Sequence, residues 1–163
     1  ERDVTRAAAP PIRVLIADDE PLAREGLAAY LRAEEGVDVV VLCSDGRDTL
    51  RRIRQEDPDL IFLDIKMPTM DGFEFLEEYQ RLGLDAADHV IILMLTSSAS
   101  FYDLERIKSF KKVKKHYSKA LTNHDVKEIL AEFFLGAQLV MVDDFAQRRK
   151  GIPIRTLSFR SIH

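Results

Sequence analysis

The chain has 163 residues, of which 46% are apolar and 32% charged, and its formal net charge is −4. This profile is typical of one soluble globular domain, large enough to fold without disulfides or a structural metal. The single cysteine, Cys43, excludes an internal disulfide, and the longest apolar run, residues 90–95, is far shorter than the ~20 residues of a membrane-spanning helix. Residues 1–11 lack the apolar stretch of a signal peptide, so a cytoplasmic location is expected.

The charge is unevenly distributed along the chain. Residues 136–163 carry a net charge of +3, which leaves −7 for residues 1–135, yet residues 108–119 hold six lysines and no acidic residue. Because the positive charge is confined to short stretches, a nucleic-acid-binding surface is not indicated for the whole chain. The lysines of residues 108–119 are interpreted either as a solvated face or as a docking surface for an acidic partner.

In the first half of the chain, apolar runs alternate with helical patterns. Residues 12–17 are the first predicted strand and residues 37–43 the second. Between them Pro21 begins a predicted helix, in which these residues follow the helical period: Leu22, Gly26, Leu27, Tyr30 and Leu31. A helix expected after Ser44 rests on Leu50 and Ile53 alone.

The second half of the chain repeats the pattern. Residues 60–63 and 90–95 are short aliphatic runs of the kind buried on both faces of a parallel sheet, and residues 113–117 are a weaker candidate. Three further helical stripes are predicted, the last with Thr122 as its N-cap: Phe75, Tyr79 and Leu82; Phe101, Leu104 and Ile107; and Val126, Ile129, Leu130, Phe133 and Phe134.

Strand and helix thus alternate five times. Alternation at this spacing calls for a parallel sheet with right-handed crossovers and helices on both faces, so the predicted fold class is a doubly wound, five-stranded α/β domain. We expect this domain to span residues 12–135. A flexible lead over residues 1–11 would precede it, and an extension of unknown role over residues 136–163 would follow.

Polar residues follow four of the five predicted strands. Because the carboxyl ends of parallel strands meet at one edge of the sheet, we expect these side chains to lie close together. They are Asp18, Asp19 and Glu20 after the first strand, Asp64 after the third, Thr96, Ser97 and Ser98 after the fourth, and Lys119 after the fifth.

Three clustered carboxylates would destabilise one another's ionised forms, so a cation is expected among them. Carboxylate oxygens favour Mg²⁺ or Mn²⁺ over zinc, and the four histidines lack zinc-site spacing. A carboxylate beside such a cation can act as a nucleophile toward phosphorus and form an aspartyl-phosphate. The alternative is that Asp18, Asp19 and Asp64 merely cap the helices that follow them.

Other chemistries are poorly supported. The seven glycines are too widely spaced for a dinucleotide-binding loop or a P-loop, and no Gly-x-Ser-x-Gly motif is present. A magnesium-dependent aspartyl phosphatase would use the same groups. Its usual signature places two aspartates two residues apart after the first strand, whereas Asp18 and Asp19 are adjacent.

These motifs resemble the receiver domain of two-component response regulators, the CheY-like family. The resemblance covers residues 12–135 and rests on Asp18-Asp19-Glu20, the run DIKMPTMDG from Asp64 to Gly72, LTSS over residues 95–98, and Lys119. It implies a flavodoxin-like sheet of strand order 2-1-3-4-5. It also implies a switch that is phosphorylated, with at most self-catalysed phosphorylation and dephosphorylation, rather than a turnover enzyme.

Carried over residue by residue, the resemblance implies a role for each group. Asp64 would accept a phosphoryl group from a sensor histidine kinase or a phosphotransfer protein. Asp18, Asp19, Asp64 and the backbone carbonyl of Lys66 would hold Mg²⁺ or Mn²⁺. Lys119 and the switch hydroxyl of Thr96 would contact the phosphate, with Ser97 and Ser98 as neighbours. The switched surface would be the face of the fourth helix, fifth strand and fifth helix, and a homodimer could form there.

Two positions depart from the family pattern. His116 stands where the aromatic switch partner is usual, and its ring could occupy the same inward and outward rotamers. Ala120 stands where the lysine is usually followed by a proline in a cis peptide. Because a non-proline cis bond costs about 3 to 4 kcal/mol, this loop is expected to be trans or strained. A receiver-like module that binds partners without phosphorylation is therefore the alternative function.

Residues 136–163 do not continue the alternation of strand and helix. Apolar residues at strand-like intervals over residues 139–142 and 154–162 are separated by Gly151 and Pro153. We expect this extension to dock on its own domain or on a second copy of the chain, the alternative being a linker. It is too short for a DNA-binding domain, so neither a nucleic acid nor a membrane is an expected partner.

Overall fold

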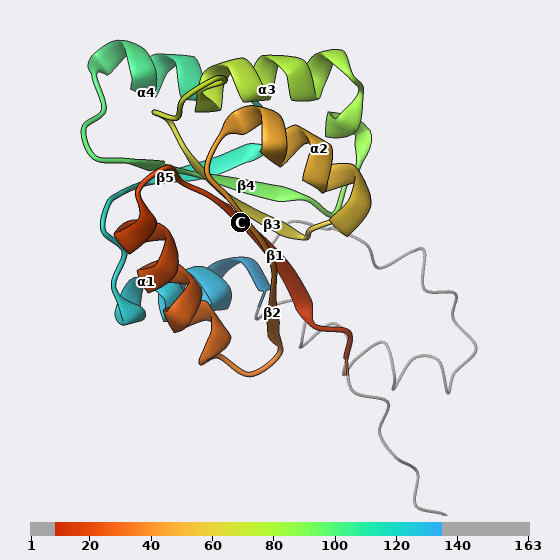
Figure 1. Ribbon diagram of the computed structural model, residues 1–163, viewed down its shortest axis with the longest axis vertical. Helices are drawn as coiled ribbons and strands as arrows, with labels where there is room; N and C mark the ends of the chain where they lie inside the picture. Colours follow the sequence, from red (N-terminus) through yellow and green to blue (C-terminus); the bar gives the residue numbers. More distant parts are fainter. Residues whose placement is uncertain (1–8, 135–163) are drawn as a thin grey trace, which may run out of the picture. The chain divides into compact units, whose positions relative to one another are not determined.

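The computed structural model describes residues 9–134 and confirms the predicted alternation of strands and helices (Figure 1). The predictions for residues 1–8 and 136–163 lie outside the described residues. The elements are β1 (Ile12–Ala17), α1 (Pro21–Arg32), β2 (Val37–Cys43), α2 (Gly46–Glu56), β3 (Leu60–Asp64), α3 (Gly72–Arg81), the 3-10 turn η1 (Leu84–Ala86), β4 (Ile91–Thr96), α4 (Phe101–Ile107) and β5 (Val113–Ser118). A further helix includes residues 123–134, so Thr122 directly precedes it.

The five strands form one parallel sheet in the order β2-β1-β3-β4-β5, as predicted. Its register pairs Ala17 with Leu63 and Asp64 with Leu95, so the carboxyl ends of β1, β3 and β4 lie at one edge. The order places β1 and β3 side by side in the centre. Polar residues that directly follow these strands therefore converge at that edge.

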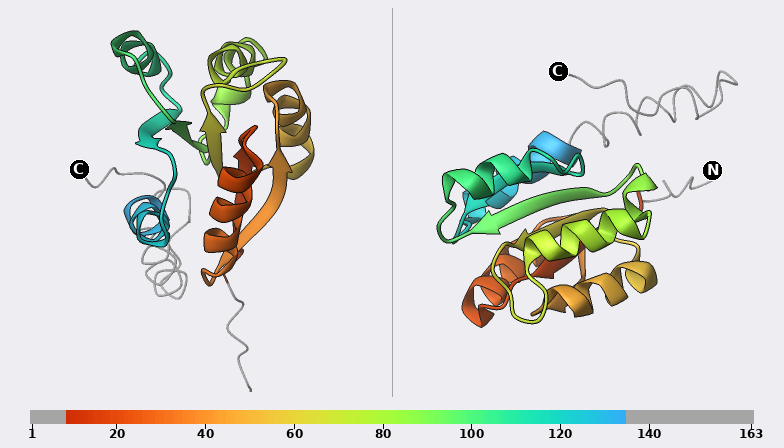
Figure 2. Two further views of the ribbon diagram at one scale, coloured as in Figure 1. Left: turned by 60° about the vertical axis from the view of Figure 1, so that its left-hand side comes forward. Right: turned by 90° about the horizontal axis from the view of Figure 1, so that it is seen from above.

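Helices cover both faces of the sheet. Figure 1 shows α2, α3 and α4 on one face and α1 on the other, and Figure 2 shows α2 and α3 side by side. On the first face Leu15, Ile61 and Met94 belong to a buried cluster that includes Phe75 and Tyr79 of α3. Alternate residues of the same strands, such as Ile16 and Phe62, are also fully buried. Burial on both faces explains why these strands are continuous apolar runs.

The edge strand β5 differs from the central strands. Lys114, Lys115 and His116 are exposed, and its predicted extent, residues 113–117, lengthens by one residue to Ser118. An edge strand with charged outward residues is protected against pairing with a further chain. This exposure explains why β5 was the weakest strand prediction, since its charged residues leave no continuous apolar run.

Four residues of the predicted helical stripes are exposed and do not enter the core: Leu22, Tyr30, Leu82 and Phe101. The side chain of Leu22 is 90% exposed and that of Phe101 is 72% exposed, although both follow the apolar period of their helices. Each lies in the first turn of its helix, where α1 and α4 begin beyond the ends of the strands. The later residues Leu27, Leu31 and Ile107 are buried as expected.

Candidate phosphorylation site

Backbone hydrogen bonds fix the strand ends that carry the predicted site. The amide of Asp18 donates to the carbonyl of Cys43 at 3.0 Å, and the amide of Ile65, next to Asp64, donates to the carbonyl of Leu95 at 3.0 Å. Asp64 is the last residue of β3, and Thr96 is the last residue of β4. The two polar side chains are thus held by the ordered sheet and not by a loop.

Three aspartates form the acidic cluster that the sequence predicts. One carboxylate oxygen from each of Asp18, Asp19 and Asp64 lies within 4.8 Å of the others. Asp18 and Asp64 are buried, at 1% and 3% exposure, while Asp19 is exposed. Hard oxygen ligands in this arrangement suit Mg²⁺, which usually takes one or two carboxylates and keeps several waters. The open side at Asp19 leaves room for such waters.

The helix-capping alternative for these aspartates is wrong. The N-cap residue of α1 is Glu20, with no side-chain cap bond, and the N-cap of α3 is Asp71, whose carboxylate accepts from the amide of Glu74 at 2.8 Å. Neither Asp18 nor Asp64 occupies an N-cap position. Their carboxylates face the cluster instead, where another attraction must offset the cost of burying like charges.

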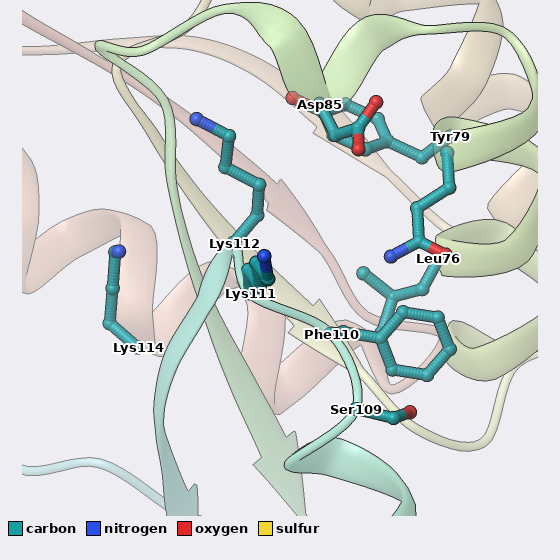
Figure 3. Close-up of a pocket in the computed structure, with 9 residues that line it drawn as sticks. Leu76, Tyr79, Asp85, Ser109, Phe110, Lys111, Lys112 and Lys114 are labelled. Carbon is teal, nitrogen blue, oxygen red and sulfur yellow. The ribbon is translucent and has the colours of Figure 1, made fainter.

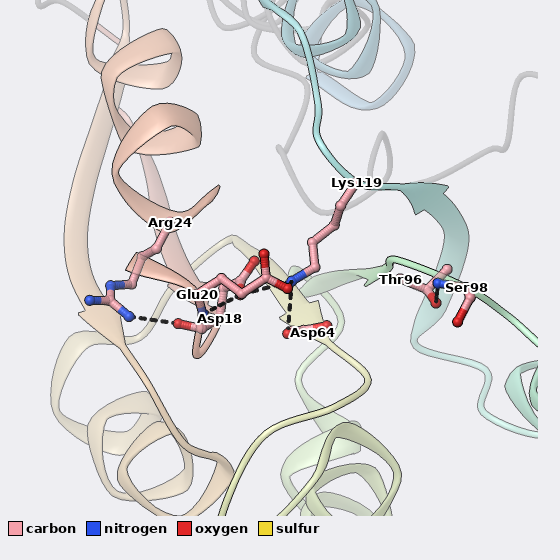
Figure 4. Close-up of polar contacts among 7 residues, drawn as sticks. All are labelled: Asp18, Glu20, Arg24, Asp64, Thr96, Ser98 and Lys119. Carbon is pink, nitrogen blue, oxygen red and sulfur yellow. Dashed lines mark hydrogen bonds and ion pairs between the residues drawn. The ribbon is translucent and has the colours of Figure 1, made fainter. Parts of the chain in front are cut away.

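The ammonium of Lys119 supplies that attraction (Figure 4). Its Nζ donates to Asp18 Oδ1 at 2.9 Å, to Asp64 Oδ2 at 3.0 Å and to Glu20 Oε1 at 3.1 Å. The side chain is only 7% exposed. Although burial lowers the pKa of Lys119, its hydrogen bonds to Asp18, Asp64 and Glu20 raise that pKa above its usual value, so the lysine is a permanent cation.

Asp64 has an unusual pKa. Burial raises the pKa of its carboxyl to about 7, and the negative charge of Asp18 adds to the rise, while the hydrogen bond from Lys119 opposes it. A carboxyl that titrates near neutrality, in a cluster of opposite and like charges, is typical of a functional group. A divalent cation bound by the same oxygens would favour the ionised, nucleophilic form.

The loop that carries Asp18 is held by two contacts. Arg24 Nη1 donates to the backbone carbonyl of Asp18 at 2.7 Å, and the amide of Glu20 donates to Asp18 Oδ1 at 2.9 Å. Arg24 lies one turn into α1, so the helix and the acidic loop are joined (Figure 4). Arg24 was not among the predicted site residues, because a side chain that reaches a backbone carbonyl leaves no pattern of residue types in the sequence.

The motif that begins at Asp64 ends in Gly72 because the backbone at this position approaches Asp64 closely. A Cβ atom at Gly72 would lie 2.5 Å from the carbonyl oxygen of Asp64, and the Gly72 amide donates to the carbonyl of Ile65 at 2.8 Å. Between them the chain turns through Thr69, which has a φ of 66°. This turn brings α3 back against the end of β3, so the close approach requires a residue without a side chain.

The predicted switch residues lie apart from the acidic cluster. Thr96 is buried, and its Oγ1 accepts from the amide of Ser98 at 3.1 Å, some way from Asp64 in Figure 4. His116 is exposed on β5, where it pairs with Met94 in register. The role of His116 as a switch partner stays a prediction. Ser97 and Ser98 are exposed.

The loop after β5 contains the Lys119–Ala120 peptide bond, which was expected to be trans or strained. The Lys119–Ala120 peptide is cis, and the amide of Lys119 donates to the carbonyl of Thr96 at 2.8 Å. With Ala120 in place of the usual proline, Lys119 Nζ still contacts both Asp18 and Asp64.

Comparison with known proteins decides the family. Residues 14–131 match the response regulator receiver domain. The chain belongs to this family. As a receiver domain it has a phosphoacceptor role in two-component signal transduction, and interaction with histidine kinases or phosphotransfer proteins is general among receivers. The predicted bounds, 12–135, stay a prediction.

The chain is similar to parts of two longer curated proteins. The chain is 41% identical over 91 residues to protein-glutamate methylesterase/protein-glutamine glutaminase 5 of Anaeromyxobacter dehalogenans, and this match covers 56% of this chain and 24% of the relative. It is 36% identical over 99 residues to the transcriptional regulatory protein BtsR of Escherichia coli, and this match covers 61% of this chain and 38% of BtsR. The chain therefore spans well under half the length of these relatives.

Solved structures confirm the receiver fold. The signal receiver domain of the putative response regulator NarL from Mycobacterium tuberculosis superposes with a TM-score of 0.65 at 24% identity, over 76% of this chain and 96% of that domain. A CheY-like receiver domain protein from Methanospirillum hungatei superposes with a TM-score of 0.64 at 25% identity, over 75% of this chain and 92% of the other. No helix among the described residues of this receiver is long and apolar enough to cross a membrane.

Proposed function

We propose that Asp64 is the phosphoacceptor of this receiver and takes its phosphoryl group from the phosphohistidine of a sensor kinase or phosphotransfer protein. The proposal rests on the position of Asp64 between the positive charge of Lys119 and the negative charges of the neighbouring aspartates. Its Oδ2 lies 3.0 Å from Lys119 Nζ, and its carboxylate belongs to the cluster with Asp18 and Asp19. A nucleophile needs a cation nearby that also stabilises the charge on the incoming phosphoryl oxygens.

The donor set around Asp64 fits Mg²⁺ or Mn²⁺. Asp18, Asp19 and Asp64 would hold the ion, with the backbone carbonyl of Lys66 as a further ligand, and the ion would neutralise phosphoryl oxygens when bound. The three carboxylates lie close enough for a shared cation, and the cluster contains no thiol or imidazole. Lys119 compensates part of the negative charge of the cluster through its ion pairs with Asp18 and Asp64.

The transfer step follows from these positions. An oxygen of Asp64 forms a bond to phosphorus as the N–P bond of the donor histidine breaks, and the imidazole leaves after taking up a proton. Lys119 stays protonated and shifts its hydrogen bond from the Asp64 carboxylate to a phosphoryl oxygen. Hydrolysis of the same acyl phosphate returns Asp64 to its ionised form, so the receiver is at most a catalyst of its own phosphorylation and dephosphorylation.

A movement of the Thr96 hydroxyl would couple phosphorylation of Asp64 to a change at the protein surface. Its oxygen accepts from the Ser98 amide, which leaves its own hydrogen available for a phosphoryl oxygen. A movement of Thr96 toward Asp64 would pull on the segment of residues 96–100 that leads into α4, and it would leave space beside β5 for the His116 ring. The surface of α4 and β5 would thereby change for a partner or a second copy of the chain.

The two alternative functions have less support. A module that works without phosphorylation was favoured by Ala120, yet Lys119 reaches Asp64. A magnesium-dependent aspartyl phosphatase would have to turn over a phosphate ester, and the adjacent pair Asp18 and Asp19 does not have the spacing of that class. Steady turnover of an aryl phosphate by the chain would support the phosphatase over the receiver switch.

Phosphorylation by a small donor tests the proposal. The full chain is incubated with acetyl phosphate and Mg²⁺, and its intact mass is measured with and without excess chelator. We expect one added phosphoryl group on the wild type and none on Asp64→Asn. Asp88→Asn, an exposed carboxylate remote from the cluster, is the matched control and keeps the adduct. An unmodified wild type, or an undiminished adduct on Asp64→Asn, would contradict the proposal.

A further inference from the structure

The side chain of Arg106 joins α4 to α3 by two contacts. Its Nη2 donates to Glu77 Oε1 at 2.6 Å, and its Cζ lies 4.4 Å from the centroid of the Phe73 ring. Phe73 and Glu77 lie one turn apart on α3, so a single guanidinium spans that turn with an ion pair and a cation–π contact. Arg106 is thus a bridge between two helices rather than a solvated surface charge.

The α3 side of this bridge is fixed beside the phosphorylation site. Phe73 directly follows Gly72, which lies against the Asp64 carbonyl and whose amide donates to the Ile65 carbonyl at 2.8 Å. The Phe73 side chain is buried, and its ring packs against Phe110 with ring centroids 6.4 Å apart. The first turn of α3 cannot shift without disturbing the end of β3, so it is a rigid support for the guanidinium.

Helix α4, in contrast, is weakly packed. Of its seven residues only Ile107 is buried, and Leu104 is partly buried against the core, whereas Phe101 and Tyr102 are 72% and 83% exposed. The segment of residues 97–100, which connects β4 to α4, contains no buried residue. A helix with so few buried apolar contacts is displaced at a low cost in free energy.

A cavity beside α3 adds to this freedom (Figure 3). It has a volume of about 570 Å³ and is lined by Leu76 and Tyr79 of α3 and by Phe110, which lies between α4 and β5. A cavity of this size means that the segment after α4 is incompletely packed against α3. Because the apolar packing of α4 is sparse, the contacts of Arg106 supply a large share of what holds this helix against α3.

We propose that Arg106 forms a latch with Phe73 and Glu77 that holds α4 against α3 in the unphosphorylated chain and opens on phosphorylation. The inference rests on the proposed function, because it needs the phosphoryl group on Asp64 to draw Thr96 and the start of α4 with it. That movement separates Arg106 from its partners, since the first turn of α3 stays in place. Exposed ion pairs and cation–π contacts are individually weak, so the latch biases the equilibrium between two positions of α4 without locking it.

Phosphorylation rates of latch variants test the proposal. The full chain is treated with acetyl phosphate and Mg²⁺, and its intact mass is followed with time. A contact made only in the unphosphorylated position of α4 opposes phosphorylation, so Arg106→Ala and Glu77→Gln should each react about 2- to 5-fold faster than the wild type. The double variant should react no faster than Arg106→Ala, because both changes remove the same ion pair. Arg106→Lys keeps the charge but lacks the planar guanidinium, so its rate should lie between those of the wild type and Arg106→Ala.

An ion pair within α3 supplies matched controls. Arg81 Nη2 lies 2.6 Å from Glu78 Oε2, but both residues belong to one helix. Arg81→Ala and Glu78→Gln therefore make the same changes of size and charge as the latch variants without removing a contact between helices. Both controls should be phosphorylated at the wild-type rate.

Amide hydrogen exchange distinguishes a latch from a contact that merely stabilises α4. In the wild type, exchange over residues 101–107 should become about 2- to 5-fold faster in excess acetyl phosphate, because the latch opens. In Arg106→Ala it should be as fast without acetyl phosphate and change little when the phosphodonor is added. Arg81→Ala should keep the wild-type difference. A merely stabilising contact would raise exchange equally in both forms of Arg106→Ala.

Three results would overturn the latch and leave Asp64 as the phosphoacceptor: wild-type rates in both Arg106→Ala and Glu77→Gln, equal acceleration by Arg81→Ala, or exchange raised equally in both forms of Arg106→Ala. A wild type that gains no phosphoryl group would contradict the proposed function and the latch with it. The mass of the phosphorylated wild type therefore tells the two failures apart.

Discussion

Gly72 lies directly against the backbone of Asp64: a Cβ atom on Gly72 would come within 2.5 Å of the Asp64 carbonyl oxygen. The two nearest atoms it would meet are backbone atoms of Asp64 and its neighbour Ile65, which cannot move aside as the end of a flexible side chain can. The first turn of α3 and the end of β3 are therefore fixed relative to each other through a contact that excludes any side chain.

Gly72→Ala should consequently destabilise the fold by about 1 to 3 kcal/mol, because the added methyl group displaces the backbone at Asp64. Gly26→Ala in α1 is the matched control. No atom lies within 4 Å of a Cβ at Gly26, and alanine is the better helix former, so this change should stabilise by up to about 1 kcal/mol. Urea unfolding of both variants measures the difference. Equal stability of the two variants would contradict the close approach.

Arg24 should affect metal binding without touching the metal. Its guanidinium holds the Asp18 carbonyl at 2.7 Å, so Arg24→Met should loosen the loop that presents Asp18 and Asp19 and weaken Mg²⁺ binding about 10-fold. Arg32→Met, in the last turn of the same helix, removes an equal charge from the surface and should leave the affinity nearly unchanged. Isothermal titration with MgCl₂ compares the two, and equal losses would show that only net charge matters.

Because the pKa of Asp64 is raised in the folded chain, this residue makes the free energy of unfolding depend on pH. The folded chain binds the Asp64 proton more tightly than the unfolded chain does, since the carboxyl pKa is about 7 when folded and 3.8 in the reference state. Its contribution to stability is therefore fully present below about pH 4 and is lost as the pH rises to 7. Without divalent cations, Asp64→Asn should be more stable than the wild type at pH 8, by about 1 to 4 kcal/mol, and the gap should shrink toward pH 5.

Urea unfolding in chelator at several pH values measures that gap. Asp88→Asn serves as the control, because its carboxylate is exposed and the gap to the wild type should not change with pH. A gap for Asp64→Asn that is constant between pH 5 and pH 8 would mean that Asp64 is already ionised throughout that range.

Cys43 should be unreactive in the folded chain. Burial raises the pKa of its thiol to about 11, and the residue is 2% exposed at the end of β2, so neither the thiolate nor a path to it is available. Reaction with a disulfide reagent such as DTNB should be slow under native conditions and complete in denaturant. Rapid stoichiometric labelling of the native chain would show that this end of β2 opens.

The sequence predicted the central strands well for a physical reason. β1, β3 and β4 are buried on both faces, so they are uninterrupted aliphatic runs, and parallel pairing then brings the polar residues after them to one edge. That is why the proximity of Asp18, Asp64 and Lys119 could be predicted without a structure. The edge strand β5 was the weaker strand prediction, because its exposed charged residues interrupt the apolar pattern.

Contacts that depend on the exact path of the backbone were not predictable. The hydrogen bond from Arg24 to the Asp18 carbonyl and the contact of Gly72 with Asp64 have no periodicity. The cavity beside α3 is a third case, since Tyr79 belongs to α3 whereas Phe110 and Lys112 belong to the segment between α4 and β5, and only the folded chain brings the two together. The role of His116 as a switch partner stays a prediction, because the structure shows only that this residue is exposed.

The central claim is that Asp64, among three clustered aspartates, captures the phosphoryl group. The most direct measurement is site mapping of the chain phosphorylated with acetyl phosphate and Mg²⁺, in which borohydride reduces the acyl phosphate and tandem mass spectrometry locates the resulting homoserine. We expect homoserine at position 64 alone. Homoserine at position 18 or 19 in its place, or phosphate on a side chain that resists reduction, would contradict it.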